Sequence, residues 1–275
     1  MQITGNALVV GGGSGIGRAC AVLLAREGAS AVMVADLMVD TARDAAEECE
    51  SAATNAQFNG FSFQVDITSE ESVVALFAEA SSKMGRIDYC VNCAGIGAQE
   101  AKDIAGLSLS EFQRFLNVNT TGLFLVTREA SIAMRAQKPV SVLPSDVKPD
   151  RGTTRGAIVN LGSATSMVAT AGVLAYTTSK HAALGLTKNS ALDNAAYGIR
   201  VNCVCPSWVD TPMVRKAIDG VEGLGDLIKG AVPMGRIAFP EEVADTVVYL
   251  CSPRSSYITG CGLIVDGGTT LGANR

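Results

Sequence analysis

The sequence is poor in charged and aromatic side chains and holds a single histidine. Charged residues make up 18% and aromatic residues 5% of its 275 residues, and the charged share is below the roughly 25% of an average soluble protein. We therefore expect part of the surface to pack against another surface, as in a self-associating protein. The net charge of −5 argues against nucleic acid or an anionic membrane as a partner. Because His181 is the only histidine, a metal site with several histidines is excluded and no metal is expected.

Long apolar runs are also missing, and the cysteines do not suggest cross-links. No run approaches the roughly 18 apolar residues of a membrane span, and no basic segment followed by a long apolar stretch opens the sequence. Cys90 and Cys93 lie in IDYCVNCAG, and Cys203 and Cys205 lie in IRVNCVCP. These runs are typical of strands and not of the turn that a zinc knuckle needs, so we expect buried free thiols. Free thiols indicate a reducing compartment, and we expect a cytoplasmic protein without a membrane partner.

Seven short apolar runs alternate with segments of helical periodicity. Strands buried on both faces of a parallel sheet read as continuous apolar runs, and helices must connect them. The pattern predicts an α/β fold, with one doubly wound, seven-stranded parallel sheet, helices on both faces, and a single domain over residues 1–275. The strands are expected at 7–12, 30–36, 61–66, 87–95, 156–163, 199–206 and 262–268. The helices are expected near 15–27, 40–53, 69–84, 110–137, 175–197 and 240–251.

Two segments break this alternation. Residues 138–155 are polar and hold three of the eight prolines, which predicts a surface insertion between a helix and a strand. Residues 207–240 follow the carboxyl end of the sixth strand, where ligands bind in such sheets. We therefore expect 207–240 to form a lid over a substrate.

A glycine cluster follows the first strand and opens the first helix. Gly11, Gly15 and Gly17 allow a tight turn and a close approach of the backbone to a pyrophosphate, with Ser14 and Ile16 between them. The free amides at a helix N-terminus add a favourable site for an anion. The cluster predicts a dinucleotide-binding turn; the alternative is a flexible glycine-rich turn without a ligand.

Asp36 ends the second strand, 19 residues after Gly17. A carboxylate there accepts hydrogen bonds from both hydroxyls of the adenosine ribose and repels a 2′-phosphate. No Arg or Lys lies at 12–16 or 37–39 to favour that phosphate. We predict NAD rather than NADP as the cofactor; the alternative is a surface or helix-capping aspartate.

Asp66 ends the third strand and is followed by Ile67. Its carboxylate suits the amino group of the adenine. It is equally suited to cap the helix that starts near Ser69, so both interpretations stay open.

Tyr176 and Lys180 have the spacing of neighbours on one helix face. An ammonium beside a phenol stabilises the phenolate, which then takes a proton from an alcohol or returns one to an alkoxide. Ser163 ends the fifth strand, 13 residues before the tyrosine, and can donate to the substrate oxygen. Asn119 interrupts a long helix with a polar group that could relay protons to Lys180.

With these residues together, the sequence resembles the short-chain dehydrogenase/reductase family over nearly its whole length. The resemblance implies a Rossmann fold. It implies that Tyr176 is the acid/base, and that Lys180 supports it and binds the nicotinamide ribose. Ser163 would orient the substrate, and Asn119 would hold a water beside Lys180. The matching motifs are Gly11-xxx-Gly15-x-Gly17, Asp66, Asn92-Cys93-Ala94-Gly95, Asn119, Ser163, Tyr176-xxx-Lys180, Pro206 with Thr211, Tyr257-Ile-Thr-Gly260 and Val265-Asp266-Gly267-Gly268.

The resemblance also implies further cofactor contacts. Asn92, Ala94 and Gly95 would stabilise the sheet and touch the cofactor. Val209 and Thr211 would hold its carboxamide end. A homotetramer is implied as well, built by the helices at 110–137 and 175–197 and by the C-terminal strand.

Three positions depart from the family pattern. Val10 stands where a threonine is usual, Cys93 replaces an asparagine, and Ser207 replaces a glycine. These positions support the site, so we expect them to loosen the fit of the cofactor and to leave the catalytic residues intact.

The expected substrate pocket lies beyond the strand ends, with walls from 96–99, 164–174 and the lid. Apolar wall residues predict a small hydrophobic secondary alcohol or ketone, such as a terpenoid, steroid or polyketide. The predicted apolar wall residues are Ile96, Met167, Val168, Val173, Leu174, Trp208, Met213, Val214, Ile218, Val221, Leu224, Leu227, Ile228 and Met234. The 138–155 loop resembles insertions in fungal members of the family and suggests secondary metabolism. The alternatives are a non-redox protein of this fold, such as a cyclase, isomerase or dinucleotide-bound regulator, and a hydrolase that uses Ser163.

Overall fold

The structure is a computed structural model that describes residues 3–98, 100–144, 146–220 and 222–272. Its centre is a seven-stranded sheet in the order β3-β2-β1-β4-β7-β8-β9, with every neighbouring pair parallel. This confirms the predicted single-domain, doubly wound sheet. The strands are β1 (Asn6–Val10), β2 (Ala31–Asp36), β3 (Asn59–Gln64), β4 (Tyr89–Asn92), β7 (Gly156–Leu161), β8 (Ile199–Pro206) and β9 (Gly262–Val265).

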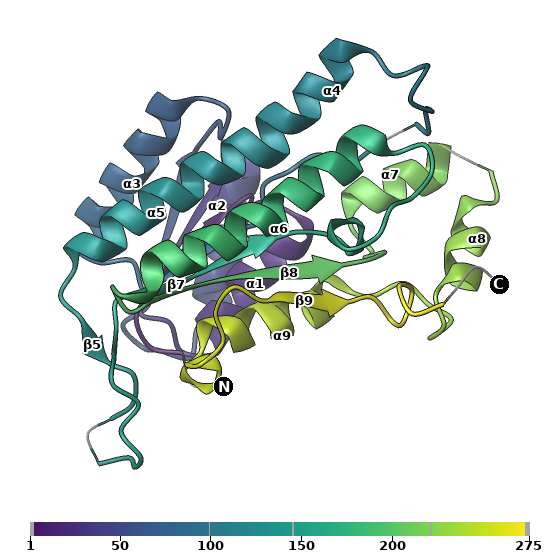
Figure 1. The fold of residues 1–275 in the computed structure, drawn as a ribbon. Helices are drawn as coiled ribbons and strands as arrows, with labels where there is room; N and C mark the ends of the chain where they lie inside the picture. The colour runs from purple at the N-terminus through teal and green to yellow at the C-terminus, as the bar shows by residue number, and fades with distance from the viewer. Residues whose placement is uncertain (1–2, 99, 145, 221, 273–275) are drawn as a thin grey trace.

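Helices cover both faces of the sheet (Figure 1). The apolar side chains of one group of helices pack with one face, and those of the other group pack with the opposite face. The first group is α1 (Gly15–Arg26), α2 (Val39–Ala52) and α9 (Pro240–Cys251). The second is α3 (Glu70–Met84), α5 (Leu123–Ala136) and α6 (Leu174–Ala195), and α4 (Leu109–Leu116) lies against α6. Within the described ranges, no helix is long and apolar enough to cross a membrane.

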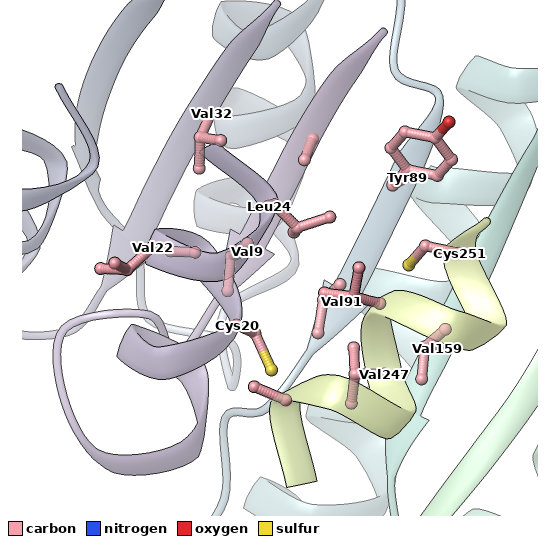
Figure 2. Packing of buried hydrophobic residues seen from close by; sticks show 14 of the residues in the cluster. Val9, Cys20, Val22, Leu24, Val32, Tyr89, Val91, Val159, Val247 and Cys251 are labelled. Carbon is pink, nitrogen blue, oxygen red and sulfur yellow. The ribbon is translucent and has the colours of Figure 1, made fainter. Parts of the chain in front are cut away.

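The core explains the continuous apolar runs of the sequence. Figure 2 shows Cys20 of α1 and Cys251 of α9 packed against Val9 and Val91, which come from the two central strands. All eight cysteines are free, and six of them are buried. Burial raises the pKa of Cys251 to about 12, so its thiol stays protonated and unreactive at neutral pH.

The strand order reverses at β1, which has β2 on one side and β4 on the other. The chain therefore leaves the carboxyl ends of β1 and β4 toward opposite faces and opens a crevice between them. Ligands of doubly wound sheets bind at such a point, so the order of the strands alone places a site here.

The two irregular segments lie at opposite ends of the sheet (Figure 1). In 138–155, β5 (Val140–Ser141) and β6 (Thr153–Thr154) form an antiparallel hairpin. In 207–240, the chain forms α7 (Pro212–Gly220) and α8 (Leu224–Ala231), two helices that the sequence did not predict. The hairpin lies near the amino ends of the strands, where Arg151 donates to the carbonyl oxygen of Pro253 at 3.0 Å.

Candidate active site

The glycine turn after β1 leaves room for a ligand against the backbone. Gly11 has a φ of +75°, and a Cβ atom there would lie 2.5 Å from the amide nitrogen of Ala94. At Gly17, a Cβ atom would lie 2.0 Å from the carbonyl oxygen of Gly11, so neither position accepts a side chain. Ser14 precedes α1 without capping it through its side chain, which leaves the first amides of the helix open to an anion.

A groove of about 380 Å³ runs along these turns at the carboxyl ends of β1 and β4. None of the described residues that line it is Lys or Arg. Most of the residues predicted to bind the cofactor lie in it: Gly11, Ser14, Gly15, Ile16, Gly17, Asp36, Asp66, Ile67, Ala94, Gly95 and Thr211. The glycine turn and the open helix end fit the pyrophosphate of a dinucleotide.

Four of the residues predicted to bind the cofactor do not line this groove. Tyr176 and Lys180 lie in α6 and are described below; the other two are Asn92 and Val209. Asn92 is buried at the end of β4, and neither polar atom of its side chain has a partner among the described residues. Val209 is also buried and forms a bridge with Ala238. The side chains of Asn92 and Val209 therefore do not reach the groove.

Other groove residues were not predicted as contacts. Most are direct neighbours of predicted ones, so sequence proximity was the only signal for them. Met213 and Val118 reach the groove from segments that only the fold brings there. The set is Leu37, Val65, Thr68, Cys93, Ile96, Val118, Pro212 and Met213.

Asp36 and Asp66 line the groove beside the glycine turn, where we predicted that the adenosine of the cofactor binds. One oxygen of Asp36 accepts from the amide of Gly13 at 2.9 Å, and the other accepts from the amide of Met38 at 3.1 Å. Asp66 accepts from the hydroxyl of Thr68 at 2.6 Å and from its amide at 2.9 Å. These bonds hold the pKa of Asp66 below its usual range, so the carboxylate is ionised at neutral pH.

The helix-capping interpretation of Asp66 is wrong. The N-cap of α3 is Ser69, whose side chain accepts from the amide of Ser72 at 3.2 Å. Asp66 instead fixes the turn before the helix and faces the groove.

Tyr176 and Lys180 lie one turn apart at the start of α6. The Nζ atom of Lys180 is 5.7 Å from the centroid of the Tyr176 ring and donates to the carbonyl oxygen of Leu161 at 2.9 Å. The edge of Phe115 packs against the tyrosine ring, with the centroids 6.3 Å apart. The lysine is buried with 6% of its surface exposed, so its charge acts on the tyrosine with little screening by water.

Ser163 follows β7 and faces the same site. Its Oγ atom accepts from the amide of Thr165 at 3.2 Å, and its own amide donates to Ser166 Oγ at 3.1 Å. Because an amide occupies one lone pair of the hydroxyl, the proton of Ser163 remains available to a substrate oxygen.

Asn119 lies in η1 (Asn117–Gly122), a π-helical segment between α4 and α5. Its Oδ1 accepts from the amide of Ile96 at 2.8 Å, and its Nδ2 donates to the carbonyl oxygen of Ile96 at 2.9 Å. Nδ2 also donates to Ser179 Oγ at 3.1 Å, and that hydroxyl donates to the carbonyl oxygen of Tyr176 at 2.7 Å. The side chain therefore joins the turn after β4 to the first turn of α6, and the water predicted beside Lys180 stays a prediction.

Ser179 was not predicted, because only the fold brings Asn119 to it.

Replacing Ser179 by alanine should lower the free energy of unfolding by about 1–2 kcal/mol, since two buried hydrogen bonds are lost. Urea denaturation measures this. The matched control is Ser82→Ala on the exposed face of α3, where a change within about 0.5 kcal/mol is expected. Equal effects of the two substitutions would contradict a structural link at Ser179.

A second cavity, of about 400 Å³, adjoins the groove. Met213 lines both hollows, so the two are neighbours. Tyr176 and Ser163 both line the cavity, which brings the predicted acid/base and the predicted substrate-orienting hydroxyl to one space. The other residues around it are Gly97, Ala98, Ala164, Thr165, Val168, Ala169, Thr170, Val173, Ser207, Trp208, Val214, Ala217, Thr269, Thr270 and Gly272.

The predicted apolar walls are only partly present. Val168, Val173, Trp208, Met213 and Val214 line the cavity, as expected. Others do not: Ile96, Met167, Leu174, Ile218, Leu224, Leu227, Ile228 and Met234 lie elsewhere. Gln99 and Val221, which were also predicted as wall residues, lie outside the described residues.

His181 does not join the site. It is exposed on α6, and its Nδ1 lies 3.0 Å from the carbonyl oxygen of Thr177 on the same helix. No histidine is therefore placed to activate Ser163, which removes the basis for a Ser-His hydrolase.

Comparison with known proteins extends over nearly the whole chain. A family model described as enoyl-(acyl carrier protein) reductase matches residues 10–270. The short-chain dehydrogenase fogB of Aspergillus ruber is 63% identical over 273 residues, covering 99% of this chain and 99% of that protein. The 2,5-dichloro-2,5-cyclohexadiene-1,4-diol dehydrogenase of Sphingobium indicum is 37% identical over 270 residues, covering 98% of each. A solved short-chain type dehydrogenase/reductase from Mycobacterium marinum matches with a TM-score of 0.84 and 31% identity, covering 98% of this chain and 96% of that one.

Proposed function

Because the chain belongs to the short-chain dehydrogenase/reductase family, whose members bind a nicotinamide dinucleotide, we propose that it is an NAD-dependent oxidoreductase of a hydrophobic secondary alcohol and its ketone. The observation that carries the proposal is the cavity that Tyr176 and Ser163 share beside the glycine-lined groove. A nicotinamide dinucleotide held in the groove would supply the acceptor or donor of the hydride that the alcohol and its ketone exchange.

The side chains of the cavity have separate tasks in this proposal. Tyr176 removes the proton of the alcohol, or protonates the alkoxide in the reverse direction. Ser163 donates its free proton to the same oxygen and so orients it. Lys180 places its buried amino group 5.7 Å from the centroid of the tyrosine ring. Asn119 holds the turn of α6 that carries Tyr176, through Ser179.

The proposed preference for NAD depends on Asp36 and on a groove without a cationic side chain among the described residues. Replacing Asp36 by alanine should lower the ratio of kcat/KM with NAD to kcat/KM with NADP by about 10- to 100-fold. A hydrogen bond to a charged group contributes about 1.5–3 kcal/mol, and the repulsion of the 2′-phosphate also disappears. Initial rates with each cofactor measure the ratio.

The control for this prediction is Asp40→Ala at the start of α2. Asp40 is exposed and pairs with Arg43 at 3.1 Å, so its loss should leave the ratio unchanged. A ratio that does not move in Asp36→Ala would count against the assignment of NAD.

The apolar part of the cavity wall and the relatives support the proposed substrate class. The diol dehydrogenase of Sphingobium indicum acts, by its name, on a cyclic alcohol. The high identity to a fungal short-chain dehydrogenase supports a role in fungal secondary metabolism, on a terpenoid, steroid or polyketide. The test is nicotinamide absorbance with a panel of such alcohols and ketones. Turnover confined to small sugars or polyols would contradict the class.

The proposed direction is oxidation of the alcohol, because NAD is mostly oxidised in cells. Ketone reduction that depends strictly on NADPH would contradict it.

The alternative is a non-redox protein of the same fold. Identical products from the wild type and Tyr176→Phe, with no change in the cofactor, would favour that alternative.

We also propose a cytoplasmic homotetramer. Eight free cysteines support a reducing compartment. Phe124 and Ile132 of α5 and Leu192 of α6 are exposed apolar side chains, and they support an interface on these helices. The apolar stretches 122–126 and 182–186 contribute mainly to the chain's own core, because Leu125, Val126 and Leu184 are buried. A monomer in light scattering would remove the tetramer from the proposal.

A further inference from the structure

Among the described residues, no charged side chain lines the cavity that holds Tyr176. Its described lining consists of apolar residues, glycines, serines and threonines. A carboxylate or phosphate group would lose its hydration there without gaining a counter-charge, which costs several kcal/mol. The whole part of the substrate that enters the cavity must therefore be neutral.

One wall of the cavity comes from the C-terminal segment 266–272, which the sequence did not predict. Thr269, Thr270 and Gly272 line the cavity together with Ser207 at the end of β8. Asp266 fastens this wall. Its Oδ1 accepts from the amide of Gly268 at 2.8 Å, and its Oδ2 accepts from the amide and the hydroxyl of Thr270, each at 2.7 Å.

The carboxylate of Asp266 is ionised. Burial alone would raise its pKa, but the hydrogen bonds from Thr270 and Gly268 outweigh burial and lower it below its usual range. An ionised carboxylate only accepts hydrogen bonds. The hydroxyl of Thr270 is therefore the donor to Asp266, and its proton is not available to a ligand.

The other two hydroxyls of this wall are committed in the same way. Thr269 Oγ1 donates to the main-chain carbonyl oxygen of Asp266 at 2.6 Å, and Ser207 Oγ donates to the same oxygen at 3.2 Å. A carbonyl oxygen has no proton to give. All three hydroxyls thus have only lone pairs left to offer a ligand, so each of them can accept a hydrogen bond but cannot donate one.

The hydroxyls described on the two sides of the cavity therefore have opposite hydrogen-bonding roles. On the side of Tyr176, the proton of Ser163 is free to donate, as suits the reacting oxygen. On the side of the C-terminal segment, Ser207, Thr269 and Thr270 only accept. We propose, on the basis of the proposed function, that the substrate is a free, uncharged hydroxy-ketone or diol whose second hydroxyl donates to this wall. The expected substrate carries two oxygens in different roles: one reacts, and the other is a hydrogen-bond donor that a methyl ether or a second ketone cannot replace.

The test uses neutral bicyclic ketones that differ in one group. The probes are 1-tetralone with a hydroxyl at C5, C6 or C7, the matching methyl ethers, unsubstituted 1-tetralone and the 6-carboxylate. Trp208 lines the cavity and is the only tryptophan, so its fluorescence reports binding whether or not turnover occurs. Dissociation constants are measured with and without NAD, and nicotinamide absorbance is followed in parallel.

We expect at least one hydroxy-tetralone to bind about tenfold or more tightly than its methyl ether, because a site built to pair with a hydroxyl rejects an analogue that leaves its groups unpaired. The carboxylate should bind worst. In Thr269→Val the preference for hydroxyl over methyl ether should fall below about threefold. Thr269→Ser should restore it, and Thr153→Val in the distant hairpin should not affect it. Should Thr269→Val not fold, Ser207→Ala tests the same wall.

The outcomes separate the inference from the proposed function. Equal binding of hydroxyl, ether and carboxylate probes, or a preference that survives in Thr269→Val, overturns the inference even if the ketones are reduced. A hydroxyl preference in Trp208 fluorescence without any change in nicotinamide absorbance supports the inference and counts against the proposed function. Failure of every hydroxy probe to bind overturns the inference as well.

Discussion

Replacing Tyr176 by phenylalanine should lower kcat by about 1,000-fold, within the range for loss of a positioned acid/base. The ring remains packed against Phe115, and Lys180 keeps its bond to the carbonyl oxygen of Leu161. Only the hydroxyl that we propose as the acid/base is lost. Nicotinamide absorbance measures the turnover, and quenching of Trp208 fluorescence measures whether the substrate still binds.

The matched control is Tyr257→Phe. Tyr257 is fully exposed and lines neither the cavity nor the groove, so kcat should not change. If Tyr176→Phe kept more than about a tenth of the wild-type kcat, the hydroxyl would not be the acid/base. If it lost turnover and also unfolded at a lower urea concentration, the loss would reflect the fold and not the chemistry.

Replacing Gly17 by alanine should raise the dissociation constant of the dinucleotide by about 100-fold, which corresponds to about 2.7 kcal/mol. The new Cβ would lie 2.0 Å from the carbonyl oxygen of Gly11 and 2.8 Å from its carbonyl carbon. Backbone atoms cannot rotate away as a side chain can, so the glycine turn, where we propose that the pyrophosphate binds, must open. Overpacking of this kind should also lower the free energy of unfolding by about 1–3 kcal/mol. Calorimetric titration and urea denaturation measure the two effects.

Gly230→Ala is the control for this substitution. Gly230 lies in α8, and no atom lies within 4 Å of the Cβ position there. Alanine is favoured over glycine in a helix by about 0.8–1 kcal/mol, so this variant should be as stable as the wild type or slightly more stable. Unchanged dinucleotide affinity in Gly17→Ala would show that the ligand does not contact the glycine turn.

The parts of the fold that the sequence predicts are those with local signals. Strands buried on both faces must be apolar throughout, so β1 and β8 could be located from their composition. The glycine turn and the spacing of Tyr176 and Lys180 are also local, because one turn of backbone or one turn of helix contains each of them.

Other features depend on contacts between distant segments. Ser179 acquires its place only when η1 packs against α6, and nothing in the neighbouring sequence marks that contact. Helices α7 and α8 are only 9 and 8 residues long, so the helical period of their apolar residues extends over too few turns to stand out in the sequence. The pocket walls were also predicted too broadly: Leu227 is apolar but 70% exposed, and it lies away from the cavity.

The departure at Ser207 illustrates how a local expectation can be incomplete. Because it replaces the glycine usual in the family, it was expected to loosen the fit of the cofactor. In the fold it lines the cavity that holds Tyr176 and bonds to the carbonyl oxygen of Asp266. Its partner is 59 residues away, and a single sequence gives no indication of such a pair.

The placement of the two chain ends has a practical consequence for handling the protein. Ile3 is buried, its amide donates to the carbonyl oxygen of Glu27, and it precedes the amino end of β1. Thr269 and Gly272, in contrast, form part of the cavity wall. An affinity tag on the C-terminal side of Gly272 adds chain close in sequence to that wall, whereas a tag on the N-terminal side of Ile3 does not. Substrate preferences measured with C-terminally tagged protein should therefore be repeated with an N-terminal, cleavable tag before preparations are compared.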